Sequence, residues 1–139
     1  YRALFEQEMT DWPEEIREVL VERHVSLDWL RAGLQEATNV EQLYDEVRDA
    51  GPMPDVPLII LTSMGIDSFK TAVSQGTPES LLRDEIEGKQ RLYTTWAHAL
   101  HGENRLIEDV GHVTLHFRRP DAVLRAIQDL LDSLDQHSE

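Results

Sequence analysis

The sequence contains no cysteine, which excludes disulfides, thiolate metal sites and a cysteine nucleophile. Basic residues are also scarce: 13 Lys and Arg stand against 27 Asp and Glu, for a formal net charge of −14. Such a charge repels phosphate backbones and anionic lipid surfaces. We therefore expect neither a nucleic acid nor a membrane among the partners of this protein.

Long apolar runs are absent as well. The longest, from Val56 to Leu61, contains Pro57 and is far shorter than the about 18 residues that a bilayer-spanning helix needs. The N-terminus lacks the basic-then-apolar order of a signal peptide, and it lacks an initiator methionine. We expect a globular, cytoplasmic protein whose chain has been cut or trimmed.

Residues 1–51 carry helical signals only. Pro13, followed by two acidic residues, is typical of a first helical turn, and Ser26 is a candidate N-cap for a second helix. Asn39 begins a sequence with the form of a capping box, which predicts a third helix that ends before Gly51.

A different pattern begins at residue 57. Residues 57–62 form a short, continuously apolar run behind a proline-rich turn, which is typical of a strand buried on both faces. The elements expected after it are a loop over 63–76, a helix from Thr77 with a candidate break at Gly88, a strand over 104–108 and a helix from Pro120.

This alternation of strand and helix predicts a parallel sheet with crossover helices. Two strands alone would leave an apolar strand with unpaired edges, which is an aggregation hazard. We therefore expect the sheet to be completed by strands from sequence outside these 139 residues.

A Gly-His pair follows the second expected strand, and an Arg-Pro-Asp sequence then opens the last helix. Gly111-His112 and Arg119-Pro120-Asp121 thereby resemble the C-terminal end of α/β-hydrolases. The resemblance implies that His112 is the general base, held at the carboxyl edge of the sheet. It implies an α/β fold in which residues 52–139 are the C-terminal part of a hydrolase sheet with flanking helices, and residues 1–51 a helical, cap-like segment.

The same resemblance assigns the catalytic acid to Asp67, in the turn after the first strand. Met64 stands where the family usually has glycine, and the interval from Asp67 to His112 is longer than is usual. Two alternatives stay open: Asp67 could be a loop-capping residue, and a minority of the family places the acid one strand earlier.

The family's nucleophile sits on a Gly-x-Ser-x-Gly turn between a strand and a helix, and this sequence contains no such motif. Ser63 and Ser74 lie in imperfect copies of it. Leu61 replaces the first glycine in one copy, and no strand precedes the other. We therefore expect the nucleophile to lie N-terminal to Tyr1.

The remaining polar candidates carry weaker signals. Glu108 and Asp109 lie near His112 but fit solvated or capping roles. The other histidines considered, at helix ends and in loops without acidic neighbours in a ligand arrangement, are His24, His98, His101 and His116. We expect no metal and no cofactor.

The resemblance implies a hydrolase that acts on a small ester or related acyl substrate through a nucleophile–His–acid triad. Its partners would be a small-molecule substrate and the N-terminal part of the same hydrolase, and the chain alone is expected to be inactive. Four apolar side chains of the helical segment would line an apolar pocket or simply pack helices together, namely Trp12, Trp29, Leu30 and Tyr44. The alternatives are another α/β-hydrolase chemistry, such as dehalogenation, epoxide opening, cyanohydrin cleavage or cofactor-free peroxidation, and a non-catalytic, ligand-binding relative.

Overall fold

The computed structural model describes residues 1–136, and it divides into two compact units at Pro54 and Asp55. Unit 1, Tyr1–Pro54, is entirely helical. Its helices are α1 (Arg2–Glu8), α2 (Glu14–His24), α3 (Leu27–Thr38) and α4 (Val40–Asp49). Unit 2 begins at Asp55 and contains both strands.

The helix starts of unit 1 follow the expected local chemistry, with one exception. Pro13 immediately precedes α2, and the Ser26 hydroxyl accepts a hydrogen bond from the Trp29 amide at 3.3 Å to cap α3. The capping box predicted at Asn39 is wrong, because its side chain makes no cap bond to α4. Asn39 also ends α3, where its amide bonds to the last turn at φ −105° and ψ 18°, so its backbone lacks the extended conformation of an N-cap.

A small apolar cluster holds α1 to α2. Phe5, Met9 and Val21 are buried, and the Phe5 ring lies 4.8 Å from the His24 ring and edge-on to Trp29. Trp29 therefore packs against helices of its own unit, in line with the packing interpretation of that residue.

Unit 2 is built on two parallel strands, which confirms the α/β prediction in its general form. Strand β1 (Ile59–Ser63) pairs with β2 (Glu103–Ile107) in a register that runs from Ile59 opposite Glu103 to Ser63 opposite Ile107. The helices of this unit are α5 (Ser68–Val73), α6 (Glu79–Ala99), α7 (Leu115–Arg118) and α8 (Pro120–Gln136).

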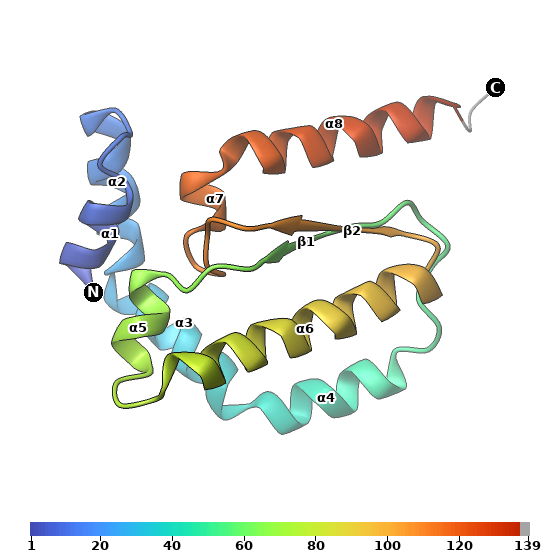
Figure 1. Cartoon of the computed structure of the whole chain (residues 1–139), viewed down its shortest axis with the longest axis horizontal. Helices are drawn as coiled ribbons and strands as arrows, with labels where there is room; N and C mark the ends of the chain where they lie inside the picture. Colours follow the sequence, from blue (N-terminus) through green and yellow to red (C-terminus); the bar gives the residue numbers. More distant parts are fainter. Residues whose placement is uncertain (137–139) are drawn as a thin grey trace. The chain divides into compact units, whose positions relative to one another are not determined.

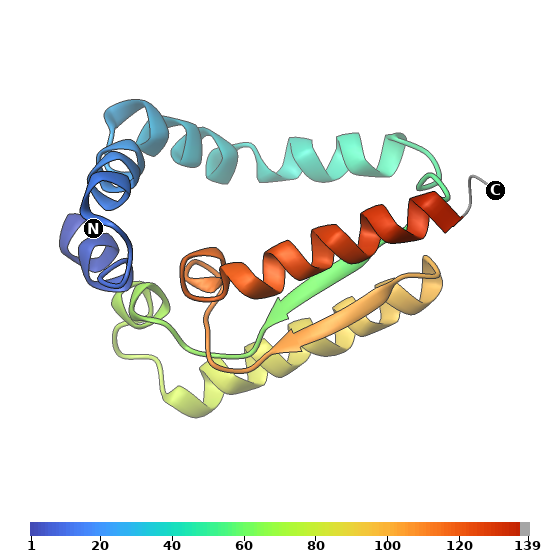
Figure 2. The ribbon, with the colours of Figure 1, turned by 90° about the horizontal axis from the view of Figure 1, so that it is seen from above.

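Helices α6 and α8 cover opposite faces of the sheet (Figures 1 and 2). Neighbouring residues of β2 show this, because successive side chains of a strand point to opposite faces. The Asn104 amide donates to the Thr94 hydroxyl of α6 at 2.9 Å, whereas Arg105 forms an ion pair with Asp129 of α8 at 2.6 Å.

Among its described residues, unit 2 has an unpaired strand edge, and α8 carries exposed apolar side chains. Within residues 1–136 the sheet holds two strands, so the other edge of β1 pairs with no strand there. Helix α8 buries the small residues Ala122 and Ala126. Four larger apolar side chains of this helix are exposed, namely Leu124, Ile127, Leu131 and Leu134.

Two expectations for residues 63–99 are wrong. The expected loop contains α5, a short helix whose single buried side chain is Phe69. The candidate break at Gly88 does not occur, since α6 is a single helix of 21 residues that includes this position. The cost of about 1 kcal/mol for one helical glycine is outweighed by the remaining turns and by packing against the sheet.

No helix among the described residues is long and apolar enough to span a bilayer.

Candidate catalytic loops at the carboxyl edge of the sheet

The loops that follow β1 and β2 stay paired beyond the strands themselves. The Met64 amide donates to the Ile107 carbonyl and the Gly65 amide to the Val110 carbonyl, each at 2.9 Å. A side chain at Gly65 would place its Cβ 2.9 Å from backbone atoms of Val110. The close approach therefore needs glycine there, and it brings the two loops to the same edge of the sheet.

Asp67 connects helix α5 and the loop that carries His112 through its carboxylate. Oδ1 accepts a hydrogen bond from the Lys70 amide at 2.7 Å and thereby caps α5. Oδ2 accepts from both the amide and the hydroxyl of Thr114, each at 3.3 Å. Asp67 thus caps a helix, where the sequence had suggested a loop-capping role as the alternative to catalysis, and it is also tied to the loop that carries His112.

The backbone of the histidine loop passes directly under the Asp67 side chain. An added Cβ at Gly111 would lie only 2.6 Å from the Cβ of Asp67 and even closer to its carboxylate. The Gly111 amide donates to the Thr114 hydroxyl at 3.1 Å, which closes the turn around His112. Gly111 is therefore required by steric contact as well as by the tightness of the turn.

His112 itself is exposed at this turn. The structure brings its loop against Asp67, but among residues 1–136 no hydrogen bond or ion pair joins the His112 ring to the Asp67 carboxylate. Because His112 is exposed, a group on an element outside the two loops could contact its ring. The roles assigned to Asp67 and His112 stay predictions.

Neither serine of the elbow look-alikes occupies a turn between a strand and a helix. Ser63 is the last residue of β1, and α5 begins five residues later; Ser74 follows the C-terminus of α5. Neither position has the sharp strand-to-helix turn that exposes a nucleophile in the family's elbow.

Three of the other histidine candidates lie on helices rather than in the two loops. His98 is in the last turn of α6, and His24 ends α2, where its Nδ1 lies 2.7 Å from the Leu20 carbonyl. His116 lies in α7, with its ring 3.9 Å from that of Phe117. Within residues 1–136, no group of three or more His, Asp or Glu side chains could hold a metal ion.

An open cleft of about 720 Å³ lies beside the paired loops, within unit 2. Its lining includes residues 64–66, residues 74–77, Glu108 and Asp109, but neither Asp67 nor His112. Glu108 and Asp109 are exposed. Their exposure suits the solvated roles predicted for these two acids.

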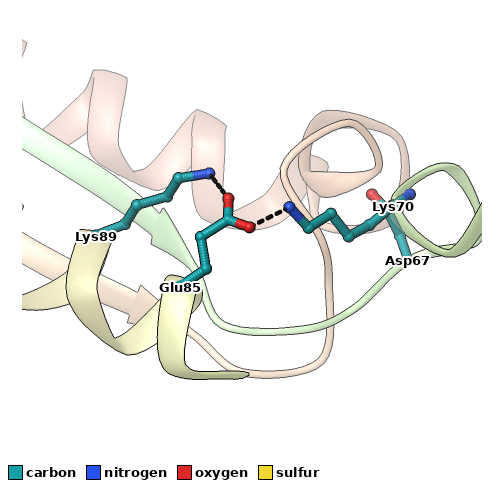
Figure 3. Close-up of polar contacts among 4 residues, drawn as sticks. All are labelled: Asp67, Lys70, Glu85 and Lys89. Atoms are coloured by element: carbon teal, nitrogen blue, oxygen red, sulfur yellow. Dashed lines mark hydrogen bonds and ion pairs between the residues drawn. The ribbon is translucent and has the colours of Figure 1, made fainter. Parts of the chain in front are cut away.

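Sequence reasoning missed an ion-pair cluster that fixes α5 to α6. Glu85 bonds to Lys70 of α5 at 2.6 Å and to Lys89 of α6 at 2.7 Å (Figure 3). The hydrogen bond from Lys70, then that from Lys89, lowers the pKa of the Glu85 carboxyl from 4.5 to about 2. Only the pair with Lys89 has helical i,i+4 spacing, so the sequence could signal that half alone.

The depressed pKa gives an expected acid dependence. The folded state favours the ionised Glu85, so its contribution is complete above about pH 4.5 and is lost as the pH falls toward about 2. We expect Glu85→Gln to lower the stability of unit 2 at pH 7 by about 0.2–1 kcal/mol, because exposed ion pairs are screened by solvent. The difference from the wild type should shrink on acidification.

Urea unfolding of both proteins between about pH 6 and about pH 3 measures this dependence. Glu87→Gln is the matched control, because Glu87 pairs only within α6, with Arg91 at 3.6 Å. An equal effect of the two substitutions at every pH would contradict a specific contribution from the bridge to α5.

Comparison with protein-family models, with curated proteins and with solved structures found no match to the chain.

Proposed function

We propose that this chain supplies the general base and the acid of an α/β-hydrolase, whose nucleophile lies in sequence outside these 139 residues. The observation that carries the proposal is the joining of the Asp67 and His112 loops at the carboxyl edge of two parallel strands. In open α/β sheets this edge is where ligand and catalytic sites form.

In this proposal His112 takes the proton of the nucleophile and returns it to the leaving group, while Asp67 orients the imidazole and stabilises the imidazolium. The exposed position of His112 suits this role, because its ring must reach a group on another element. The substrate would be a small ester or a related acyl compound, and unit 1 would act as a cap.

The strand composition supports the position proposed for the missing part. Ile59, Ile60 and Leu61 of β1 form an apolar run typical of an interior strand, whereas Glu103 and Arg105 of β2 suit an edge. The N-terminal part of the same hydrolase would then add its strands to the free edge of β1.

Activity measurements on the intact protein that contains these residues test the proposal. We expect it to hydrolyse p-nitrophenyl acetate and to react with a fluorophosphonate probe. His112→Ala should lower kcat by a factor of about 10⁴ to 10⁶, as does loss of a triad member elsewhere. His98→Ala is the matched control, since His98 is also exposed but lies in the last turn of α6.

Three outcomes would contradict the proposal. Unchanged turnover in His112→Ala would rule out His112 as the general base. The absence of both esterase activity and probe labelling in the intact protein would rule out the proposed reaction. Labelling of Ser63 or Ser74 in the isolated 139-residue chain would place the nucleophile within it.

A further inference from the structure

Thr114 is a buried polar residue at the centre of the contact between the two loops. It is 1% exposed, lies immediately before α7 and is three residues beyond Gly111. Its amide and hydroxyl both lie 3.3 Å from Oδ2 of Asp67, 47 positions away in the sequence. Few side chains in this unit are as completely enclosed, so the interaction takes place away from competing water.

The hydroxyl has more than one partner, and its single proton must be allocated among them. It accepts a hydrogen bond from the Gly111 amide at 3.1 Å, and its own proton can reach either Oδ2 of Asp67 at 3.3 Å or the Gly111 carbonyl at 3.4 Å. A charged acceptor makes the stronger hydrogen bond. We therefore assign the hydroxyl proton to Asp67.

The donors around Asp67 leave one part of its carboxylate available. Ionised carboxylates offer about four acceptor positions. Thr114 supplies two donors to Oδ2 and the Lys70 amide supplies one to Oδ1. The remaining acceptor capacity is on Oδ1, where the ring N–H of a histidine could bind.

We infer that Thr114 is a positioning residue: it holds Oδ2 of Asp67 against the turn that carries His112, so that the acceptor position of Oδ1 not used by the Lys70 amide can orient the imidazole. This inference rests on the proposed function, in which Asp67 is the acid. It deepens that function by naming the group that fixes the acid relative to the base, since the turn and the carboxylate share the same hydroxyl.

The test is a set of Thr114 variants in the intact hydrolase, assayed with p-nitrophenyl acetate. Thr114→Val keeps the volume and the amide but removes the hydroxyl, and should lower kcat about 10- to 100-fold with little change in KM, because small misplacements of catalytic groups have effects of this size. Thr114→Ser retains the hydroxyl and should restore kcat to near the wild-type value. Thr114→Cys, with a weak donor, should fall between the two and serves if the valine variant does not fold.

A double-mutant cycle with Asp67→Asn separates positioning from a general structural role. If Thr114 acts through Asp67, Thr114→Val should lower kcat much less in the Asp67→Asn background than in the wild type. A full, additive loss in that background, or a Thr114→Val enzyme as active as the wild type, would overturn the inference.

Failure of the proposed function would give a different result. If Asp67→Asn or His112→Ala leaves kcat unchanged, the acid–base pair is wrong and the inference falls with it. If both lower kcat strongly while Thr114→Val and Thr114→Cys do not, the proposed function stands and only the role of Thr114 is lost.

Discussion

Replacing Gly111 by alanine is expected to destabilise unit 2 by about 1–3 kcal/mol, the usual cost of forcing extra volume into a packed site. The new Cβ would lie 2.6 Å from the Cβ of Asp67, so the Asp67 side chain must move. Because that carboxylate caps α5 and binds Thr114, its displacement weakens both contacts at once. The steric clash therefore becomes a loss of hydrogen bonds.

Urea unfolding followed in proton–nitrogen spectra measures this effect for each unit separately. The indole signal of Trp96 reports on unit 2, while Trp12 and Trp29 report on unit 1 and should be unaffected. Gly88→Ala is the control, because its Cβ would meet nothing closer than 3.9 Å, from the Arg91 side chain. That substitution should stabilise α6 by about 0.5–1 kcal/mol. Equal stability of Gly111→Ala and the wild type would contradict the contact.

Two other glycines of unit 2 show that close backbone contacts recur where its loops and strands meet. A Cβ at Gly102 would lie 2.7 Å from the Leu58 carbonyl oxygen, and one at Gly65 would lie 2.9 Å from Val110 backbone atoms. Gly102 directly precedes β2, and Gly65 lies two residues after the end of β1. A side chain can relieve a clash by changing rotamer, but backbone atoms cannot. The paired strands and their loops therefore depend on glycine at these positions.

The strands were predictable because their signals are local. Continuous apolar character at residues 57–62 indicated a buried strand, and the helix between the strands made a parallel pairing the expected topology. The start of α8 at Pro120 was predictable for the same reason, since proline suits a first helical turn.

The missed helices are short and have weak periodic signals. Helix α1 has seven residues, α5 has six and α7 has four, too few for an apolar stripe to be recognised. The one available signal for α5 was Asp67 itself, since aspartate is a favoured N-cap. Sequence reasoning considered only a loop-capping role for Asp67 as the alternative to catalysis, and the structure shows that Asp67 caps a helix.

Thr114 could not be identified as a contact of Asp67 from the sequence alone. Its hydrogen bonds span 47 positions and depend on the relative placement of two loops, which no local pattern encodes. The nearest signal was its position three residues after Gly111, the spacing of a closed turn. Long-range polar contacts of this kind are set by the sheet register rather than by propensity.

Replacing Asp67 by alanine should have the largest effect on stability, about 2–4 kcal/mol in unit 2. Loss of a helix cap costs about 0.5–2 kcal/mol, and a buried donor left without an acceptor costs about 1–3 kcal/mol. The Thr114 amide would lose its acceptor, and α5 would lose its cap from Oδ1. The two losses fall on one side chain, so they occur together.

Asp67→Asn separates the two contributions, because an asparagine oxygen can still cap α5 while its amide nitrogen cannot accept from Thr114. We expect it to be intermediate between the wild type and Asp67→Ala in urea unfolding followed by the Trp96 indole signal, with the Trp12 and Trp29 signals unchanged. Wild-type stability of Asp67→Ala would contradict the hydrogen bonds assigned to this carboxylate. A large loss of stability in Asp67→Ala, together with loss of turnover in the milder Asp67→Asn, would show that one carboxylate both builds the edge of the sheet and acts in catalysis.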